Sequence, residues 1–149
     1  MTARVVIDTN VLLDFWVFAD TRARALHDAL LAGRVQAARS DATDAELIEV
    51  LARPAFDCAR ARRADGFQAD LQRWRNRAQY VARIVPCSLL CSDRADQKFL
   101  DLAISVAAHA LISKDRALLK LARKAKGLNL AVVPPEAALA ALGVVGALE

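Results

Sequence analysis

Two carboxylates in this sequence closely follow short apolar runs of the kind that form buried strands. Asp8 comes directly after the run VVI, and Asp115 ends the stretch ALISKD. In an open parallel sheet, ligands bind outside the carboxyl ends of the strands. We therefore expect both carboxylates at a ligand-binding edge of a sheet.

Two further carboxylates lie near the starts of predicted helices. Glu46 lies in SDATDAELIEVLARPAF, and Asp96 lies in CSDRADQKFLDLA. Asp96 shares one helical stripe with Phe99, Leu100 and Ala103, which follow it at i+3, i+4 and i+7. Burial of an unpaired charge is costly, so a carboxylate on this apolar stripe needs a partner.

The elements that would position these residues alternate between short apolar runs and helical patterns. This alternation predicts the α/β class, with a mostly parallel five-stranded sheet flanked by helices in an α/β/α sandwich. A chain of 149 residues that is 56% hydrophobic corresponds to about one domain, here residues 1–149. The predicted strands are Arg4–Ile7, Arg34–Ala38, Ala82–Val85, Ala110–Ile112 and Leu130–Val133. The predicted helices are Val11–Leu31 with a break near Asp20, Asp41–Ala52 after an N-cap at Ser40, Phe67–Ala78, Ala95–Ala107, Ala117–Lys124 before a stop at Gly127, and Glu136–Leu142.

The composition argues against several classes of site and of protein. The chain has three cysteines, and Cys87 and Cys91 have no histidine near them, which argues against a disulfide framework and a four-ligand zinc site. No stretch approaches the roughly 18 apolar residues of a membrane span, and the start of the sequence lacks a signal-peptide pattern. We therefore expect a cytoplasmic protein with no membrane partner. His27 and His109 lie far from the acidic motifs and are expected to be structural.

Four segments together resemble the PIN-domain family, and within it the branch of toxin components of toxin–antitoxin systems. In chain order they are VVIDTNVLL, AELIEVLARPAF, DRADQKFLDLA and ALISKDRALLKL. The resemblance implies a PIN-like fold with a central parallel sheet flanked by helices, and a metal-dependent ribonuclease activity. It also implies an antitoxin partner, and we expect a homodimer.

The resemblance places the metal-binding and catalytic carboxylates of this family on Asp8, Glu46, Asp96 and Asp115, with Asn10 and Ser113 as supporting polar residues. Four carboxylates that converge without basic neighbours would repel one another, and their pKa values would rise unless a divalent cation lay between them. Ligation by oxygen alone suits Mg²⁺ or Mn²⁺. The expected reaction is hydrolysis of an RNA phosphodiester by water that the metal activates.

Several acidic residues have alternative interpretations. Asp8, Asp96 and Asp115 could each serve only as a helix cap. Glu49 could replace Glu46, because the phase of the predicted helix favours either residue.

Three other acids are expected outside the metal site. Asp93 is expected to be a loop residue and Asp101 a supporting or exposed residue, with metal binding as the alternative for both. Asp14 is expected to be exposed or structural.

The net charge of +4 and the pI near 9.3 favour a polyanionic partner. Arg73, Arg75 and Arg77 belong to an arginine-rich segment that we expect to bind RNA or an acidic antitoxin segment, with a solvated face as the alternative. Trp74 is expected to pack in the core, the alternative being a base-stacking role. Rival functions are a PIN-fold RNA-processing nuclease without an antitoxin, a phosphatase for small molecules, and a binding module with a degenerate site.

Overall fold

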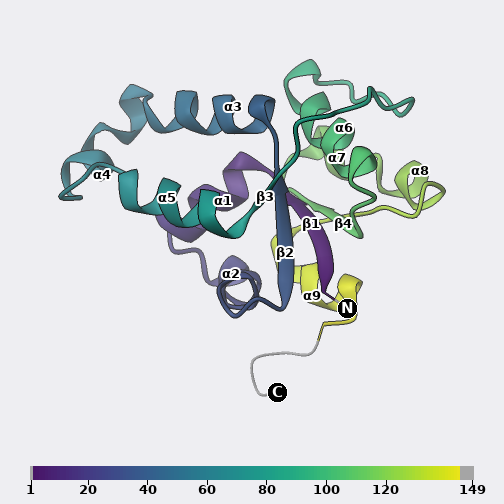
Figure 1. Ribbon diagram of the computed structural model, residues 1–149, viewed down its shortest axis with the longest axis horizontal. Helices are drawn as coiled ribbons and strands as arrows, with labels where there is room; N and C mark the ends of the chain where they lie inside the picture. The colour runs from purple at the N-terminus through teal and green to yellow at the C-terminus, as the bar shows by residue number, and fades with distance from the viewer. Residues whose placement is uncertain (1, 145–149) are drawn as a thin grey trace.

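The sheet at the centre of the chain has five parallel strands in the order β3-β2-β1-β4-β5, as the computed structural model shows (Figure 1). The structure describes residues 2–144. The strands are β1 (Ala3–Ile7), β2 (Val35–Arg39), β3 (Gln79–Tyr80), β4 (Ala110–Ile112) and β5 (Ala131–Val133). The α/β class and the parallel sheet expected from the sequence are confirmed.

Helices follow the strands in alternation. They are α1 (Thr9–Trp16), α2 (Arg24–Leu31), α3 (Asp41–Leu51), α4 (Asp57–Ala61), α5 (Gln68–Arg77), α6 (Gln97–Ser105), α7 (Arg116–Leu119), α8 (Ala122–Lys126) and α9 (Ala138–Leu142). The predicted break near Asp20 separates α1 from α2, whereas the helix predicted over Ala117–Lys124 is two short helices, α7 and α8. No helix among the described residues is long and apolar enough to cross a membrane.

Apolar side chains on both faces of the sheet explain why β1, β4 and β5 contain uninterrupted apolar runs. Val5 and Ile7 of β1 belong to a core that includes residues of α1, α2, α3 and α5. Val6 points to the opposite face and belongs to a second core with residues of α6, α7 and α8. Full burial of one such side chain contributes about 1.5–3 kcal/mol, so both layers of helices are held to the sheet mainly by apolar packing.

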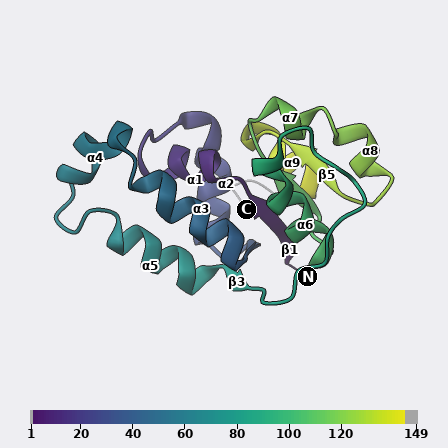
Figure 2. The same ribbon diagram turned by 90° about the horizontal axis from the view of Figure 1, so that it is seen from above.

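The helix α3 begins directly at the carboxyl end of β2. The Ser40 hydroxyl accepts a hydrogen bond from the Thr43 N–H at 3.3 Å, and the Thr43 hydroxyl accepts one from the Ser40 N–H at 2.9 Å. This reciprocal capping box fixes the start of α3, as the predicted N-cap at Ser40 requires. From there α3, α4 and α5 extend away from the sheet, with α4 at the far left of Figures 1 and 2.

The prediction of a strand over Ala82–Val85 is wrong. The third strand is Gln79–Tyr80, which pairs with Ala38 and Arg39 of β2. Because the two strands are parallel, β3 can pair only as far as β2 extends, and the Val81 N–H makes its hydrogen bond to the Arg39 carbonyl at 2.9 Å. The residues that follow have passed the end of β2 and leave the sheet.

Polar side chains along one side of α6 bind the loop that follows β3. The side chains of Gln97, Asp101 and Ser105 lie one turn apart along the helix, and each bonds to the backbone of the loop. Asp101 Oδ1, for example, accepts from the Cys87 N–H at 2.9 Å. Asp101 is therefore a loop support, and the loop that it holds leads directly to Asp93.

Candidate metal centre

The acidic residues gather where the order of the strands reverses. The chain passes from β1 outward to β2 and β3, then crosses to β4 on the other side of β1. The Asp8 N–H donates to the Ile112 carbonyl at 2.9 Å, so the carboxyl ends of β1 and β4 lie side by side. Such a switch point is where parallel sheets bind their ligands.

Ser113 connects the two acids that follow these strands. Its hydroxyl donates to Asp8 Oδ2 at 2.6 Å and accepts from the Asp115 N–H at 2.9 Å. Ser113 has no exposed surface, and Asp8 is 3% exposed. Asp8 stands at the N-cap position of α1, but its side chain makes no capping hydrogen bond of good geometry.

Three carboxylates form a tight cluster beside this connection. Asp93, Asp96 and Asp115 each place one carboxylate oxygen within 4.8 Å of the others. One oxygen of Asp93 and one of Asp115 cap short helices, accepting from the Ala95 and Ala117 N–H groups at 2.9 Å each. Asp96 is buried, and its Oδ2 has no hydrogen-bond partner among the described residues.

Burial and neighbouring negative charges raise the pKa values of Asp96 and Asp8. The pKa of Asp96 rises to about 7, first because of burial and then because of a hydrogen bond with Asp115 and the charge of Asp8. Burial also raises the pKa of Asp8, with a further increase from the charges of Glu46 and Asp115, while the hydrogen bond from Ser113 opposes the change. Asp96 and Asp8 therefore bind protons more readily than ordinary aspartates when no cation is present.

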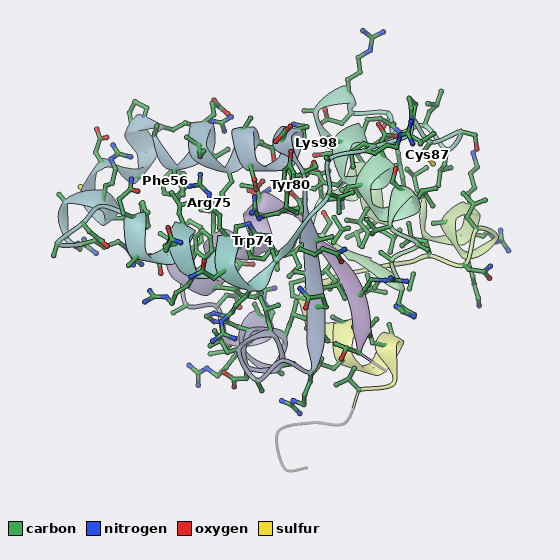
Figure 3. All side chains as sticks on the ribbon, viewed as in Figure 1. Phe56, Trp74, Arg75, Tyr80, Cys87 and Lys98 are labelled. Carbon is green, nitrogen blue, oxygen red and sulfur yellow. The ribbon has the colours of Figure 1, made fainter. Side chains whose placement is uncertain are left out.

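Glu46 faces the same region from α3, but a basic residue is bonded to it. Its Oε2 accepts from the Thr9 hydroxyl at 2.6 Å, and its Oε1 lies 2.8 Å from Lys98 Nζ. Figure 3 shows Lys98 on α6 beside the start of α3. The expectation that the acidic residues have no basic neighbours is therefore wrong at Glu46. Glu49 is exposed and pairs with Arg53, so the helix phase turns Glu46 and not Glu49 toward the centre.

The other acidic and polar candidates lie as follows. Asn10 is exposed on α1, and its side chain makes no hydrogen bond to another described residue. Asp14 is buried and forms an ion pair with Lys114 at 2.7 Å, which is a structural arrangement. Asp93 lies in a loop, as expected, and it also joins the acidic cluster. Its position before a helical turn was visible in the sequence, but its distance from Asp115 depends on the tertiary fold.

The arginine-rich segment presents its basic residues on different sides of α5. Arg73 and Arg77 line a pocket of about 350 Å³ between α1, α2 and α5, which Arg75, labelled in Figure 3, does not line. Arg73 pairs with Asp70 at 3.0 Å, and Arg77 donates to the Leu31 carbonyl at 2.9 Å. Trp74 is 6% exposed within the core, which confirms the packing interpretation.

The two histidines make structural contacts. His27 stacks on Phe15 with ring centroids 4.4 Å apart. His109 Nδ1 accepts from the Arg4 N–H at 3.0 Å, which ties the chain before β4 to β1. Neither contact involves a carboxylate of the candidate metal centre.

Comparisons with known proteins agree with this fold. Among solved structures, a chain from the crystal structure of VapBC2 from Rickettsia felis, bound to a DNA fragment from its promoter, is similar with a TM-score of 0.54 and 15% sequence identity. The alignment covers 87% of this chain and 96% of that chain. Among curated proteins, none matches the chain. Residues 4–117, which include Asp8, Glu46, Asp96 and Asp115, match the family model described as PIN domain, and the chain therefore belongs to the PIN-domain family.

Proposed function

We propose that this protein is a divalent-cation-dependent endoribonuclease and the toxin of a toxin–antitoxin pair. The observation that carries the proposal is the cluster of Asp93, Asp96 and Asp115, in which a buried carboxylate oxygen of Asp96 has no partner among the described residues. Burial of a charged carboxylate with one unpartnered oxygen is costly unless a cation binds it or a proton neutralises it. In this cluster a buried carboxylate lies close to two further carboxylates, which is the arrangement that a cation requires.

The chemistry of the donor set fits Mg²⁺ or Mn²⁺. All the donors are carboxylate oxygens, which hard divalent cations prefer, and no histidine or cysteine belongs to the cluster of Asp93, Asp96 and Asp115. Asp96 and Asp115 would hold the ion, and Asp93 belongs to the same cluster. Asp8 is connected to Asp115 through the hydroxyl of Ser113. Glu46 completes the set of four acids that the family resemblance implies.

The residues of the chain have distinct roles in the proposed hydrolysis. A bound divalent cation would polarise the phosphodiester and lower the pKa of a water molecule. Asp8, which accepts a hydrogen bond from Ser113 and whose pKa is raised by burial, would accept the proton of the attacking water. Asn10 is exposed on α1 close to Asp8 in the sequence, where it could contact the RNA backbone.

The proposed toxin role rests on the likeness to a chain of a VapBC complex and on the mainly apolar pocket beside α5 that Arg73 and Arg77 line. Arg73 and Arg77 beside apolar side chains would bind a segment that carries both acidic and apolar residues, or the phosphates of RNA. Arg75 would add to this charge from another side of α5. We further propose that the protein forms a homodimer, and a ribonuclease toxin would act on RNA in the cytoplasm.

The proposal is tested by incubating the protein with a labelled single-stranded RNA and, separately, with p-nitrophenyl phosphate. We expect cleavage of RNA in Mg²⁺ or Mn²⁺, no cleavage in EDTA, and no turnover of the small phosphate ester. Full activity in EDTA would overturn the metal requirement. Turnover of the ester without cleavage of RNA would instead indicate a phosphatase.

A further inference from the structure

We propose that Lys98 takes the place of a second cation in the acidic centre and limits it to one divalent ion per chain. This inference rests on the proposed function, because it concerns the metal that the proposed ribonuclease would bind. Lys98 lies in the segment DRADQKFLDLA, but it is not one of the four acids that the family resemblance places in the centre. Lys98 acts through Glu46 and is therefore a positioning residue.

Both oxygens of Glu46 already have partners. Lys98 Nζ lies 2.8 Å from Oε1, and the Thr9 hydroxyl lies 2.6 Å from Oε2. The side chains of Lys98 and Glu46 are 25% and 17% exposed, so water screens this ion pair less than it screens a surface pair. The ammonium group thus already offsets the charge of Glu46, one of the four acids that the family resemblance assigns to the metal.

The remaining acids divide into two sets. Asp93, Asp96 and Asp115 have oxygens within 4.8 Å of one another, and only in this set does a buried carboxylate oxygen of the centre lack a partner among residues 2–144. Glu46 is not in this set, but its Oε2 accepts a hydrogen bond from the hydroxyl of Thr9, the residue that directly follows Asp8. Asp8 and Glu46 could therefore bind a second ion together if Lys98 were absent.

Two-metal centres hold their ions about 3.5–4 Å apart, with carboxylates to offset the repulsion between the ions. In this centre the charge of Lys98 already offsets that of Glu46. A second divalent ion would either displace the ammonium group, which breaks its ion pair with Glu46, or lie against it, which is unfavourable because like charges repel. One ion at the cluster of Asp93, Asp96 and Asp115 is the arrangement that this charge distribution favours.

The experiment counts bound Mn²⁺ per chain by titration, with the electron paramagnetic resonance signal of free Mn²⁺ as the readout. We expect one ion for the parent, two for Lys98→Met, and one for Lys98→Arg, which restores the charge. Lys120→Met is the matched control, because Lys120 is an exposed lysine at the end of α7, and it should bind one ion. Circular dichroism establishes that each variant is folded, and Lys98→Gln replaces Lys98→Met if the latter is not.

The outcomes separate this inference from the proposed function. Two ions in the parent, or one ion in folded Lys98→Met with unchanged affinity, would overturn the role of Lys98 and leave a metal-dependent ribonuclease intact. No bound ion in the parent, together with RNA cleavage in EDTA, would overturn the proposed metal requirement itself and this inference with it. The inference is supported if Lys98→Met binds two ions while the parent and Lys98→Arg each bind one.

Discussion

The Ser113 hydroxyl lies 2.6 Å from Asp8 Oδ2 and joins the carboxyl end of β4 to that of β1. The same hydroxyl oxygen accepts from the Asp115 N–H at 2.9 Å. Two acids of the candidate centre are therefore held relative to each other by one side chain that has no exposed surface.

Replacement of Ser113 by alanine should destabilise the protein. The change leaves the buried Asp8 Oδ2 and the half-buried Asp115 N–H without this partner, and an unsatisfied buried group costs about 1–3 kcal/mol. Thermal melting checks this, with Ser88→Ala as the control because Ser88 is exposed. Equal melting temperatures for Ser113→Ala and the parent would show that the two hydrogen bonds do not stabilise the centre.

Asp8→Asn should abolish RNA cleavage without lowering the stability of the metal-free protein. The substitution removes one charge from a set of mutually repulsive carboxylates, and the asparagine oxygen can still accept from Ser113. In EDTA the variant should melt no lower than the parent. A large drop in melting temperature would instead assign Asp8 a mainly structural role.

The raised pKa of Asp96 predicts a pH dependence of stability in the absence of metal. With a pKa of about 7 in the folded protein and about 3.9 in the unfolded chain, Asp96 binds a proton only in the folded state between these values. Its contribution to stability is therefore present at low pH and is lost as the pH rises through about 7. Asp96→Asn lacks this loss, so in EDTA its melting temperature should exceed that of the parent by more at pH 8 than at pH 5. The same difference at both pH values would contradict the raised pKa.

Arg73 and Arg77 should contribute more to RNA binding than Arg75, because they line one pocket. The double variant Arg73→Ala, Arg77→Ala should bind RNA more weakly than the parent, in a background made inactive by Asp96→Asn. The slope of log K against log salt should fall by about 0.7 for each lost phosphate contact with a single strand. Arg75→Ala is the matched control and should change both quantities less. Unchanged affinity and slope in the double variant would exclude these two arginines from RNA binding.

The parts of the fold that followed from the sequence are those that local patterns determine. The apolar runs before Asp8 and Asp115 identified β1 and β4, and Ser40 marked the start of α3 because a capping side chain lies within one helical turn of its partner. The third strand was misplaced because its pairing depends on where β2 ends, which the apolar run Ala82–Val85 does not reveal. The short helix α4 carries no buried residue, so it has no apolar stripe by which the sequence could reveal it.

The same distinction applies to the candidate centre. The positions of Asp8, Glu46, Asp96 and Asp115 followed from the strand ends and the family resemblance. Lys98 was missed because its contact with Glu46 spans 52 residues of sequence. The closeness of Asp93 to Asp115 likewise arises only when the loop held by α6 meets the end of β4.

The central claim, that the buried carboxylate of Asp96 is part of a metal-dependent ribonuclease centre, is tested most directly by the initial rate of RNA cleavage in Mn²⁺. Asp96→Asn should cleave at least about a hundredfold more slowly than the parent, because loss of groups that merely orient a metal ligand already costs about 10- to 100-fold. Asp57→Asn, which removes an exposed aspartate of α4, is the matched control and should cleave at the parental rate. Equal rates for folded Asp96→Asn and the parent would contradict the account.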